Sequence, residues 1–157
     1  MAKVNPESPG TSRSSSSDVR CSRIDHGRKQ ILFVERKRIV LVEVHPLFRA
    51  GLALLLEWRM GFEIMQAGSL TETHRVLGDR SGAVDLAIVD LDLLEGGGKS
   101  VIASIREAEP NVPVLALTAS ESRERQAQAL EAGADEVLNL AADIEEVIGA
   151  VERLASG

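Results

Sequence analysis

The sequence predicts an α/β domain built on a five-stranded parallel sheet with helices on both faces. Short apolar runs rich in β-branched residues alternate with longer windows of helical periodicity from residue 38 onward. The short runs are apolar almost throughout, which is typical of strands covered on both faces. Regular alternation of strands and helices gives parallel neighbours joined by right-handed crossovers.

Five short runs are the predicted strands. The first is rich in valine, isoleucine and leucine, follows a basic segment, and stops before His45 and Pro46, a pair typical of a turn. The remaining runs are bounded by glycine, proline or charged residues. In chain order the predicted strands are Ile39–Val44, Phe62–Ala67, Leu86–Asp90, Val114–Thr118 and Glu136–Asn139.

The helical windows between these strands carry recognisable start signals. Ser69 with Glu72, and Asp143 with Glu146, have the spacing of a capping box. Pro46 suits a first helical position, where a missing N–H costs nothing. The predicted helices are Leu47–Arg59, Leu70–Asp79, Lys99–Ala108, Ser122–Ala132 and Asp143–Leu154.

Charge and composition divide the chain in two. Residues 1–38 hold nine Lys/Arg against four Asp/Glu, and the rest holds nine against twenty. Residues 1–37 form a basic, Ser-rich extension before the domain at 38–157. Residues 1–30 have few apolar side chains, so we expect them to be disordered. The acidic body repels phosphate backbones, so direct DNA binding by this chain is not expected.

Several classes of protein are excluded by the sequence. No apolar run approaches the ~20 residues of a membrane span, and the N-terminus has no apolar stretch of a secretory signal. The single cysteine, Cys21, cannot form an internal disulfide. We therefore expect a cytoplasmic protein in a reducing setting.

Polar side chains stand where three of the predicted strands end. Glu43 closes the first strand, Asp90 and Asp92 the third, and Thr118 and Ala119 the fourth. Ligands of open parallel sheets bind at the carboxyl ends of the strands. Three carboxylates and a hydroxyl meeting at one rim form a site of hard oxygen donors suited to Mg²⁺.

Four segments resemble a known family. RIVLVEVHPLFRAGL, DLAIVDLDLLEGGG, NVPVLALTAS and EAGADEVLNLAAD are similar to the successive motifs of response regulator receiver domains, the phosphoacceptor modules of two-component signalling. The resemblance covers about residues 38–157, and the first segment is especially similar to receivers of helix-turn-helix transcriptional regulators. It implies the flavodoxin-like receiver fold, with strand order 2-1-3-4-5.

The resemblance also implies a role for individual residues. Asp90 matches the phosphoacceptor, which attacks the phosphoryl group carried by a sensor histidine kinase or phosphotransfer protein. Glu43 matches the first acid that helps hold Mg²⁺, and Asp92 would offer its backbone carbonyl to the metal. Thr118 matches the hydroxyl that turns toward the phosphoryl group, and Gly98 matches the glycine before the third helix.

The sequence departs from the family at four positions. Val44 stands at the second acidic position and Leu140 at the lysine that pairs with phosphoryl oxygens. Leu94 replaces a proline, and Val137 stands at the aromatic switch position. Mg²⁺ and lysine neutralise charge on the transferring group, so we expect weak phosphotransfer and weak Mg²⁺ binding. The Asp92 side chain is either a solvated loop acid or a partial substitute for the carboxylate missing at Val44.

Three functions remain open. The chain is either an atypical receiver phosphorylated on Asp90 or a degenerate receiver that binds proteins without phosphate. In both cases it is expected not to be a turnover enzyme. A remote third interpretation is a haloacid-dehalogenase-like phosphohydrolase, since Asp90 and Asp92 are similar to its first motif. That motif belongs on a first strand with a hydroxyl at the position of Leu94. His45 is interpreted as a polar loop residue.

Homodimerisation is a further expectation from the resemblance. Receivers of this type pair through the face formed here by residues 122–132, 136–139 and 143–154. The first of these segments is polar and expected to lie exposed. A weak, salt-sensitive dimer would be joined by ion pairs repeated across a two-fold axis. The candidate charges are Arg123, Arg125, Asp135 and Glu136.

Overall fold

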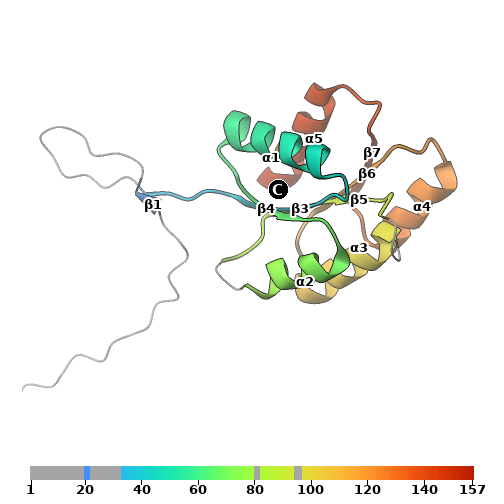
Figure 1. Cartoon of the computed structure of the whole chain (residues 1–157), viewed down its shortest axis with the longest axis horizontal. Coiled ribbons are helices and arrows are strands. Elements are labelled where there is room, and N and C mark those ends of the chain that lie inside the picture. Colours follow the sequence, from blue (N-terminus) through green and yellow to red (C-terminus); the bar gives the residue numbers. More distant parts are fainter. Residues whose placement is uncertain (1–19, 22–32, 80–81, 94–96) are drawn as a thin grey trace, which may run out of the picture.

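Five parallel strands form the central sheet (Figure 1). The computed structural model describes residues 20–21, 33–79, 82–93 and 97–157. The strand order is β4-β3-β5-β6-β7, which is 2-1-3-4-5 when only these five are counted along the chain. The predicted receiver fold is therefore confirmed. The strands are β3 (Arg38–Val42), β4 (Glu63–Ala67), β5 (Leu86–Asp90), β6 (Val114–Thr118) and β7 (Glu136–Asn139).

Burial along the strands follows their place in the sheet. Every residue of β3, β5 and β6 is buried. The edge strands β4 and β7 are mostly half-buried. The three central strands have helices over both faces, which is why their sequences are apolar runs without alternation.

Five helices cover the two faces of the sheet, with α1 and α5 on one side and α2, α3 and α4 on the other (Figure 1). Leu56 of α1 and Val151 of α5 pack with Ile39 and Leu41 in one core. On the opposite face Ile102 of α3 belongs to a second core. The helices are α1 (Pro46–Met60), α2 (Leu70–Gly78), α3 (Gly97–Ala108), α4 (Arg123–Ala132) and α5 (Ile144–Ser156).

The structure confirms one predicted capping box and contradicts the other. The Ser69 hydroxyl accepts from the N–H of Glu72 at 3.2 Å, and the Glu72 carboxylate accepts from the N–H of Gly68. Asp143 makes no side-chain cap. The N–H of Glu146, the group such a cap would use, donates instead to the Asp143 carbonyl at 2.9 Å. A tight first turn has therefore replaced the expected side-chain cap.

A short pairing lies outside the main sheet. Strand β1 (Arg20–Cys21) pairs antiparallel with β2 (Phe33–Val34), which the sequence analysis did not expect. Residues 1–19 and 22–32 lie outside the described residues, so their disorder stays a prediction. Among the described helices, none has the length and apolarity that crossing a membrane requires.

The charges predicted to join two copies are largely engaged within one chain. Arg125 pairs with Asp92 at 2.9 Å and Asp135 with Arg106 at 2.7 Å. Glu136 pairs with Arg153 at 2.8 Å. The dimer and the ion pairs proposed for it stay predictions. As expected, α4 is exposed, with Ala129 its buried residue.

Candidate functional site

The polar residues predicted to converge do so at the carboxyl ends of three neighbouring strands. Asp90 is the last residue of β5, Thr118 is the last of β6, and Glu43 directly follows β3. Their exposed fractions are 2%, 0% and 1%. Two carboxyl groups are therefore buried at a rim where side chains of parallel sheets usually meet ligands.

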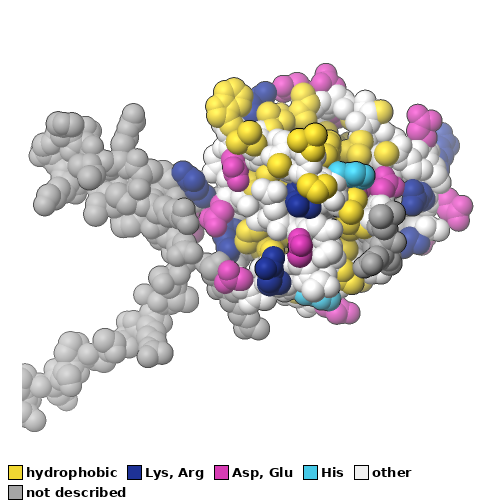
Figure 2. All heavy atoms as spheres, in the orientation of Figure 1, with side chains coloured by type: hydrophobic (Ala, Val, Ile, Leu, Met, Phe, Trp, Pro, Cys, Tyr) yellow, Lys and Arg dark blue, Asp and Glu magenta, His cyan; other side chains and the backbone are white. Residues whose placement is uncertain are grey.

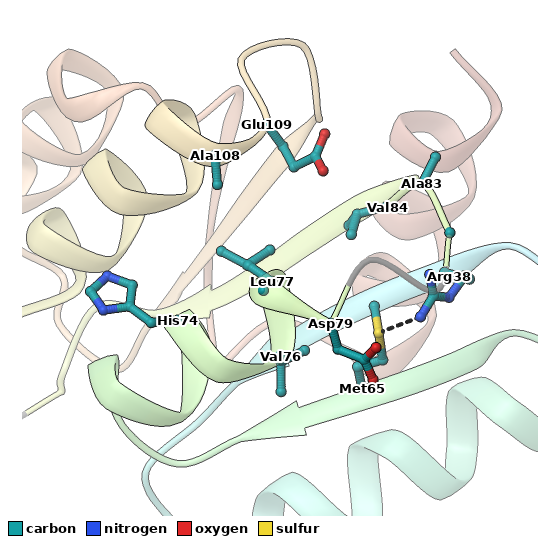
Figure 3. Close-up of a pocket in the computed structure, with 12 residues that line it drawn as sticks. Arg38, Met65, His74, Val76, Leu77, Asp79, Ala83, Val84, Ala108 and Glu109 are labelled. Atoms are coloured by element: carbon teal, nitrogen blue, oxygen red, sulfur yellow. Dashed lines mark hydrogen bonds between the residues drawn. The ribbon is translucent and has the colours of Figure 1, made fainter. Parts of the chain in front are cut away.

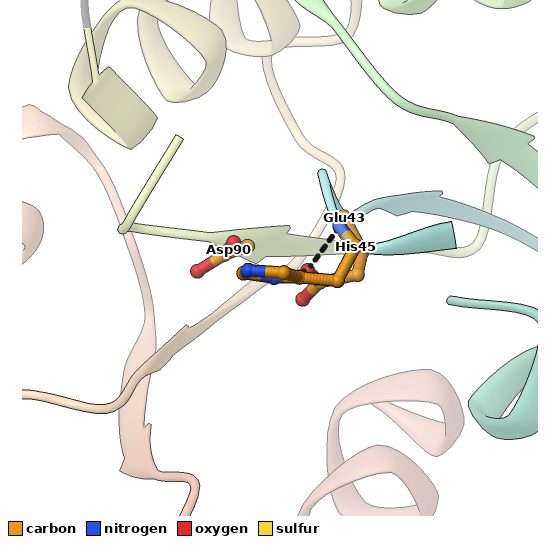
Figure 4. A group of neighbouring side chains, drawn as sticks. All are labelled: Glu43, His45 and Asp90. Atoms are coloured by element: carbon orange, nitrogen blue, oxygen red, sulfur yellow. Dashed lines mark hydrogen bonds and ion pairs between the residues drawn. The ribbon is translucent and has the colours of Figure 1, made fainter. Parts of the chain in front are cut away.

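His45 joins this pair of carboxyl groups. Glu43 Oε1 accepts from the backbone N–H of His45 at 2.9 Å and lies 2.8 Å from His45 Nδ1. One ligand atom each from Glu43, His45 and Asp90 lies within 4.8 Å of the others (Figure 4). His45 lies in the exposed turn after β3, as the interpretation of a polar loop residue expected, but its approach to the two carboxyl groups was not predicted. The available signal was a metal-ligand residue type two positions after Glu43, in the turn that leaves the strand.

The Asp90 carboxyl group has one satisfied and one unsatisfied oxygen. Oδ1 accepts from the N–H of Asp92 at 2.8 Å. Oδ2 is buried and has no hydrogen-bond partner. Burial raises the pKa of Asp90 to about 6; the N–H of Asp92 opposes this shift, and the nearby Glu43 and Asp92 carboxylates add to it. Ionisation of Asp90 therefore destabilises the folded protein.

This pKa predicts that Asp90→Asn stabilises the metal-free protein. The pKa of Asp90 is about 6 in the folded protein, above its ordinary value of 3.8. The folded state therefore loses stability relative to the unfolded state as the pH rises between these two values. The full difference corresponds to about 3 kcal/mol, so we expect a gain of about 1–3 kcal/mol at pH 7. Urea unfolding with chelator present measures it. The gain should shrink at pH 4, and an equally stable or weaker variant at pH 7 would contradict the prediction.

Asp92 connects two loops of the rim. Its Oδ2 accepts from the N–H of Ala119 at 2.8 Å, and its Oδ1 pairs with Arg125 at 2.9 Å. Because both oxygens have protein partners, the side chain is not a free, solvated loop acid, and its role as a substitute for the carboxylate missing at Val44 stays a prediction. The metal role of its backbone carbonyl stays a prediction.

Val44 and Leu140 stand where the family carries charged phosphotransfer groups, and both lie in apolar surroundings. Val44 is half-buried against the core. The N–H of Leu140 donates to the Thr118 carbonyl at 2.8 Å, which holds Leu140 beside the site. Its side chain lines an apolar cavity of about 450 Å³ with Leu47, Phe48, Leu117 and Ile144, among others. Val137 is also half-buried against the core, and Leu94 lies outside the described residues.

Gly98 lies against the strand that carries Asp90. A Cβ at this position would be 2.7 Å from Leu91 Cα and 2.9 Å from the Asp90 carbonyl oxygen. Both distances are too short for any side chain. The glycine expected from the resemblance therefore allows α3 to begin directly against the end of β5.

A second cavity lies at the opposite end of the sheet. It has a volume of about 620 Å³ and is lined by Arg38, Met65 and His74, among others (Figure 3). Arg38 is the first residue of β3, and its guanidinium donates to Met65 Sδ at 3.1 Å. This end of the sheet carries the amino ends of the strands, so the Glu43–Asp90 rim is the better candidate for function.

Comparisons with known proteins agree with this fold. Residues 39–152 match the family model described as response regulator receiver domain. A curated relative is the transcriptional regulatory protein PhoP of Escherichia coli (strain K12), 32% identical over 117 residues, which are 74% of this chain and 51% of PhoP. The chain thus spans about half the length of the curated relatives it matches.

Two solved structures illustrate the likeness. A response regulator protein from Burkholderia pseudomallei, solved with a phosphorylated aspartic acid, calcium ion and citrate, is 30% identical with a TM-score of 0.67; the match covers 76% of this chain and 69% of that one. TrrA from Thermotoga maritima, solved in complex with Mg²⁺-BeF, is 28% identical with a TM-score of 0.65, covering 75% and 98%.

The fold and the acidic rim together are those of a receiver-type signalling domain. This chain belongs to the response regulator receiver domain family, the family of two-component signalling.

Proposed function

We propose that this chain is an atypical receiver that signals through protein contacts without phosphorylation of Asp90. The observation that carries the proposal is the Asp92 carboxylate, held between the N–H of Ala119 and the guanidinium of Arg125. Asp92 follows β5, Ala119 follows β6, and Arg125 belongs to α4. The Asp92 side chain therefore ties together the loops that a phosphoryl group on Asp90 would have to reach.

The site is also poor in groups that support phosphoryl transfer. Positioning and charge neutralisation supply nearly all the catalysis of this reaction. The side chains of Val44 and Leu140 bring no charge to the rim. Glu43 and Asp90 fit a divalent cation, because both are buried and one Asp90 oxygen has no partner. Bound Mg²⁺ would offset phosphoryl charge, but its donor set lacks the carboxylate expected at Val44, so weak binding is expected.

An exposed apolar stripe offers a surface for a partner. Leu47, Leu54 and Trp58 of α1 have exposed fractions of 88%, 66% and 79%. Their spacing of seven and four residues places them on one side of the helix, and Gly51 between them is exposed. Figure 2 shows hydrophobic side chains gathered over α1. Because this spacing is that of a helix–helix seam, the proposed partner presents an amphipathic helix to α1.

A phosphorylation assay tests the proposal. The full chain is incubated with a small phosphodonor such as acetyl phosphate and Mg²⁺, and intact mass is measured with rapid quenching. We expect no gain of a phosphoryl group. In parallel, Asp92→Ala should speed amide hydrogen exchange at residues 119–125, because the loop loses its anchor, whereas Glu124→Ala should not. Stoichiometric phosphorylation of the parent would contradict the proposal.

The second candidate function is phosphoacceptance by Asp90 from a sensor histidine kinase. The buried oxygen of Asp90, without a partner at the end of β5, favours it. Phosphate uptake by the parent that is lost in Asp90→Asn would support this function. A phosphohydrolase has less support, because Asp90 and Asp92 lie on and after the third strand of the main sheet rather than the first. Turnover of the donor without retained phosphate would favour it.

A further inference from the structure

The two buried carboxyl groups of Glu43 and Asp90 lie next to each other at the rim. Glu43 and Asp90 are 1% and 2% exposed, and Asp90 Oδ2 has no hydrogen-bond partner. Buried charges in folded proteins are paired or coordinate a metal. A group that neutralises this pair is therefore required whenever both carboxyls are ionised.

The arginines of the rim do not supply that group. Arg49 Nη1 donates to the main-chain carbonyl of Glu43 at 2.8 Å, not to its carboxylate. Arg125 is paired with Asp92. Leu140 stands where the family has a lysine. Within the described part of the chain, His45 brings a ring nitrogen within 4.8 Å of one oxygen of each carboxyl group.

We propose that Glu43, His45 and Asp90 form a binding site for a divalent transition-metal ion of the Zn²⁺ type rather than for Mg²⁺. Mg²⁺ prefers oxygen ligands in an octahedral arrangement. Imidazole nitrogen suits Zn²⁺, Cu²⁺, Fe²⁺ and Ni²⁺, and a mixed set of nitrogen and carboxylate oxygen is common for such ions. Val44 removes an oxygen ligand that Mg²⁺ would use, and His45 adds a nitrogen ligand. Together these two differences shift the expected preference from Mg²⁺ to Zn²⁺-type ions.

The arrangement of His45 fits this role. Its Nδ1 lies 2.8 Å from Glu43 Oε1, and a histidine held at one ring nitrogen by a carboxylate presents the other nitrogen to a metal. Figure 4 shows the imidazole extending from the turn after β3 toward Asp90. The His45 side chain is 72% exposed, so it can rotate to shorten the present ligand spacing. Three protein ligands leave a coordination position for water or a partner's side chain.

This site is independent of the proposed function, because it needs neither a phosphoryl group nor a partner. A bound metal would neutralise the two carboxylates and connect the ends of β3 and β5. If the metal-site proposal fails, the interaction of Asp92 with Ala119 and Arg125 is unaffected, and so is the proposed function that rests on it.

Metal titration of the full, chelator-treated chain tests the proposal. Co²⁺ binding is followed by its visible d–d absorption, and Zn²⁺ binding by calorimetry in excess Mg²⁺. We expect one ion per chain at this site and at least tenfold weaker binding in His45→Ala, a change comparable to losing a metal-site partner. His74→Ala is the matched control, because His74 is exposed on α2 and lines the cavity at the opposite end of the sheet.

Two further variants complete the test. Asp90→Asn should weaken Zn²⁺ binding, whereas Cys21→Ser combined with His26→Ala should leave it unchanged. Circular dichroism and urea unfolding verify that His45→Ala is folded, and His45→Gln provides a second variant. Equal Zn²⁺ affinity in the parent and both His45 variants would overturn the proposal. Displacement of Zn²⁺ by Mg²⁺ at equal concentration, or loss of binding in the Cys21/His26 variant alone, would also overturn it.

Discussion

Val44→Asp combined with Leu140→Lys is expected to make Asp90 a rapid phosphoacceptor. The aspartate adds the metal ligand missing beside Glu43, and the lysine adds a cation for the phosphoryl oxygens. One preorganised group of this kind contributes ~3–4 kcal/mol, about a hundredfold or more in rate. The double variant should therefore take up phosphate from acetyl phosphate at least a hundredfold faster than the parent, and only with Mg²⁺. Intact-mass time courses measure both rates.

The structure provides room for the lysine side chain at Leu140. Leu140 lines a cavity of about 450 Å³, and its main chain is anchored to Thr118. A lysine ammonium at this position can pair with the carboxylates of Glu43 and Asp90, which offsets its desolvation. Asp90→Asn in the same background should abolish uptake. If the double variant is folded and still takes up no phosphate, the missing groups are not the cause of the defect, and the Asp92–Arg125 contact becomes the next one to remove.

Gly98→Ala is expected to cost about 2–3 kcal/mol of unfolding free energy, the range for forcing extra atoms into a packed interior. The added Cβ would meet Leu91 Cα at 2.7 Å and the Asp90 carbonyl oxygen at 2.9 Å. Both atoms are main chain at or next to the end of central strand β5, so they cannot move aside as a flexible side chain would. Urea unfolding followed by circular dichroism measures the loss.

Gly51→Ala is the matched control, with the opposite expected sign. Gly51 lies inside α1, and a Cβ there meets nothing within 4 Å. Alanine in an exposed helix interior is favoured over glycine by about 1 kcal/mol. The same denaturation experiment should therefore show a gain for Gly51→Ala and a loss for Gly98→Ala. Similar stabilities for the two variants would contradict the close packing of α3 against β5.

The sequence by itself determined the architecture and the location of the site. Apolar runs without alternation identified the buried strands β3, β5 and β6, because a strand covered on both faces needs apolar side chains at every position. The expected convergence of Glu43, Asp90 and Thr118 followed from the parallel sheet, whose carboxyl ends all meet at one edge. The absence of charge at Val44 and Leu140 was equally readable, since it depends on residue type and position alone.

Only the tertiary structure decided which partners the polar side chains at that rim bind. Asp92 could have faced solvent or a metal, and it bonds to Ala119 and to Arg125, which is 33 positions away in the chain. His45 is a loop residue as expected, but the approach of its ring to two carboxyl groups, one after β3 and one at the end of β5, was visible only in the structure. The N–H of Glu146 donates to the backbone carbonyl of Asp143, although the Asp143 side chain was expected to accept it. Each outcome depends on which of several competing partners lies within about 3 Å, a distance set by packing between segments remote in sequence.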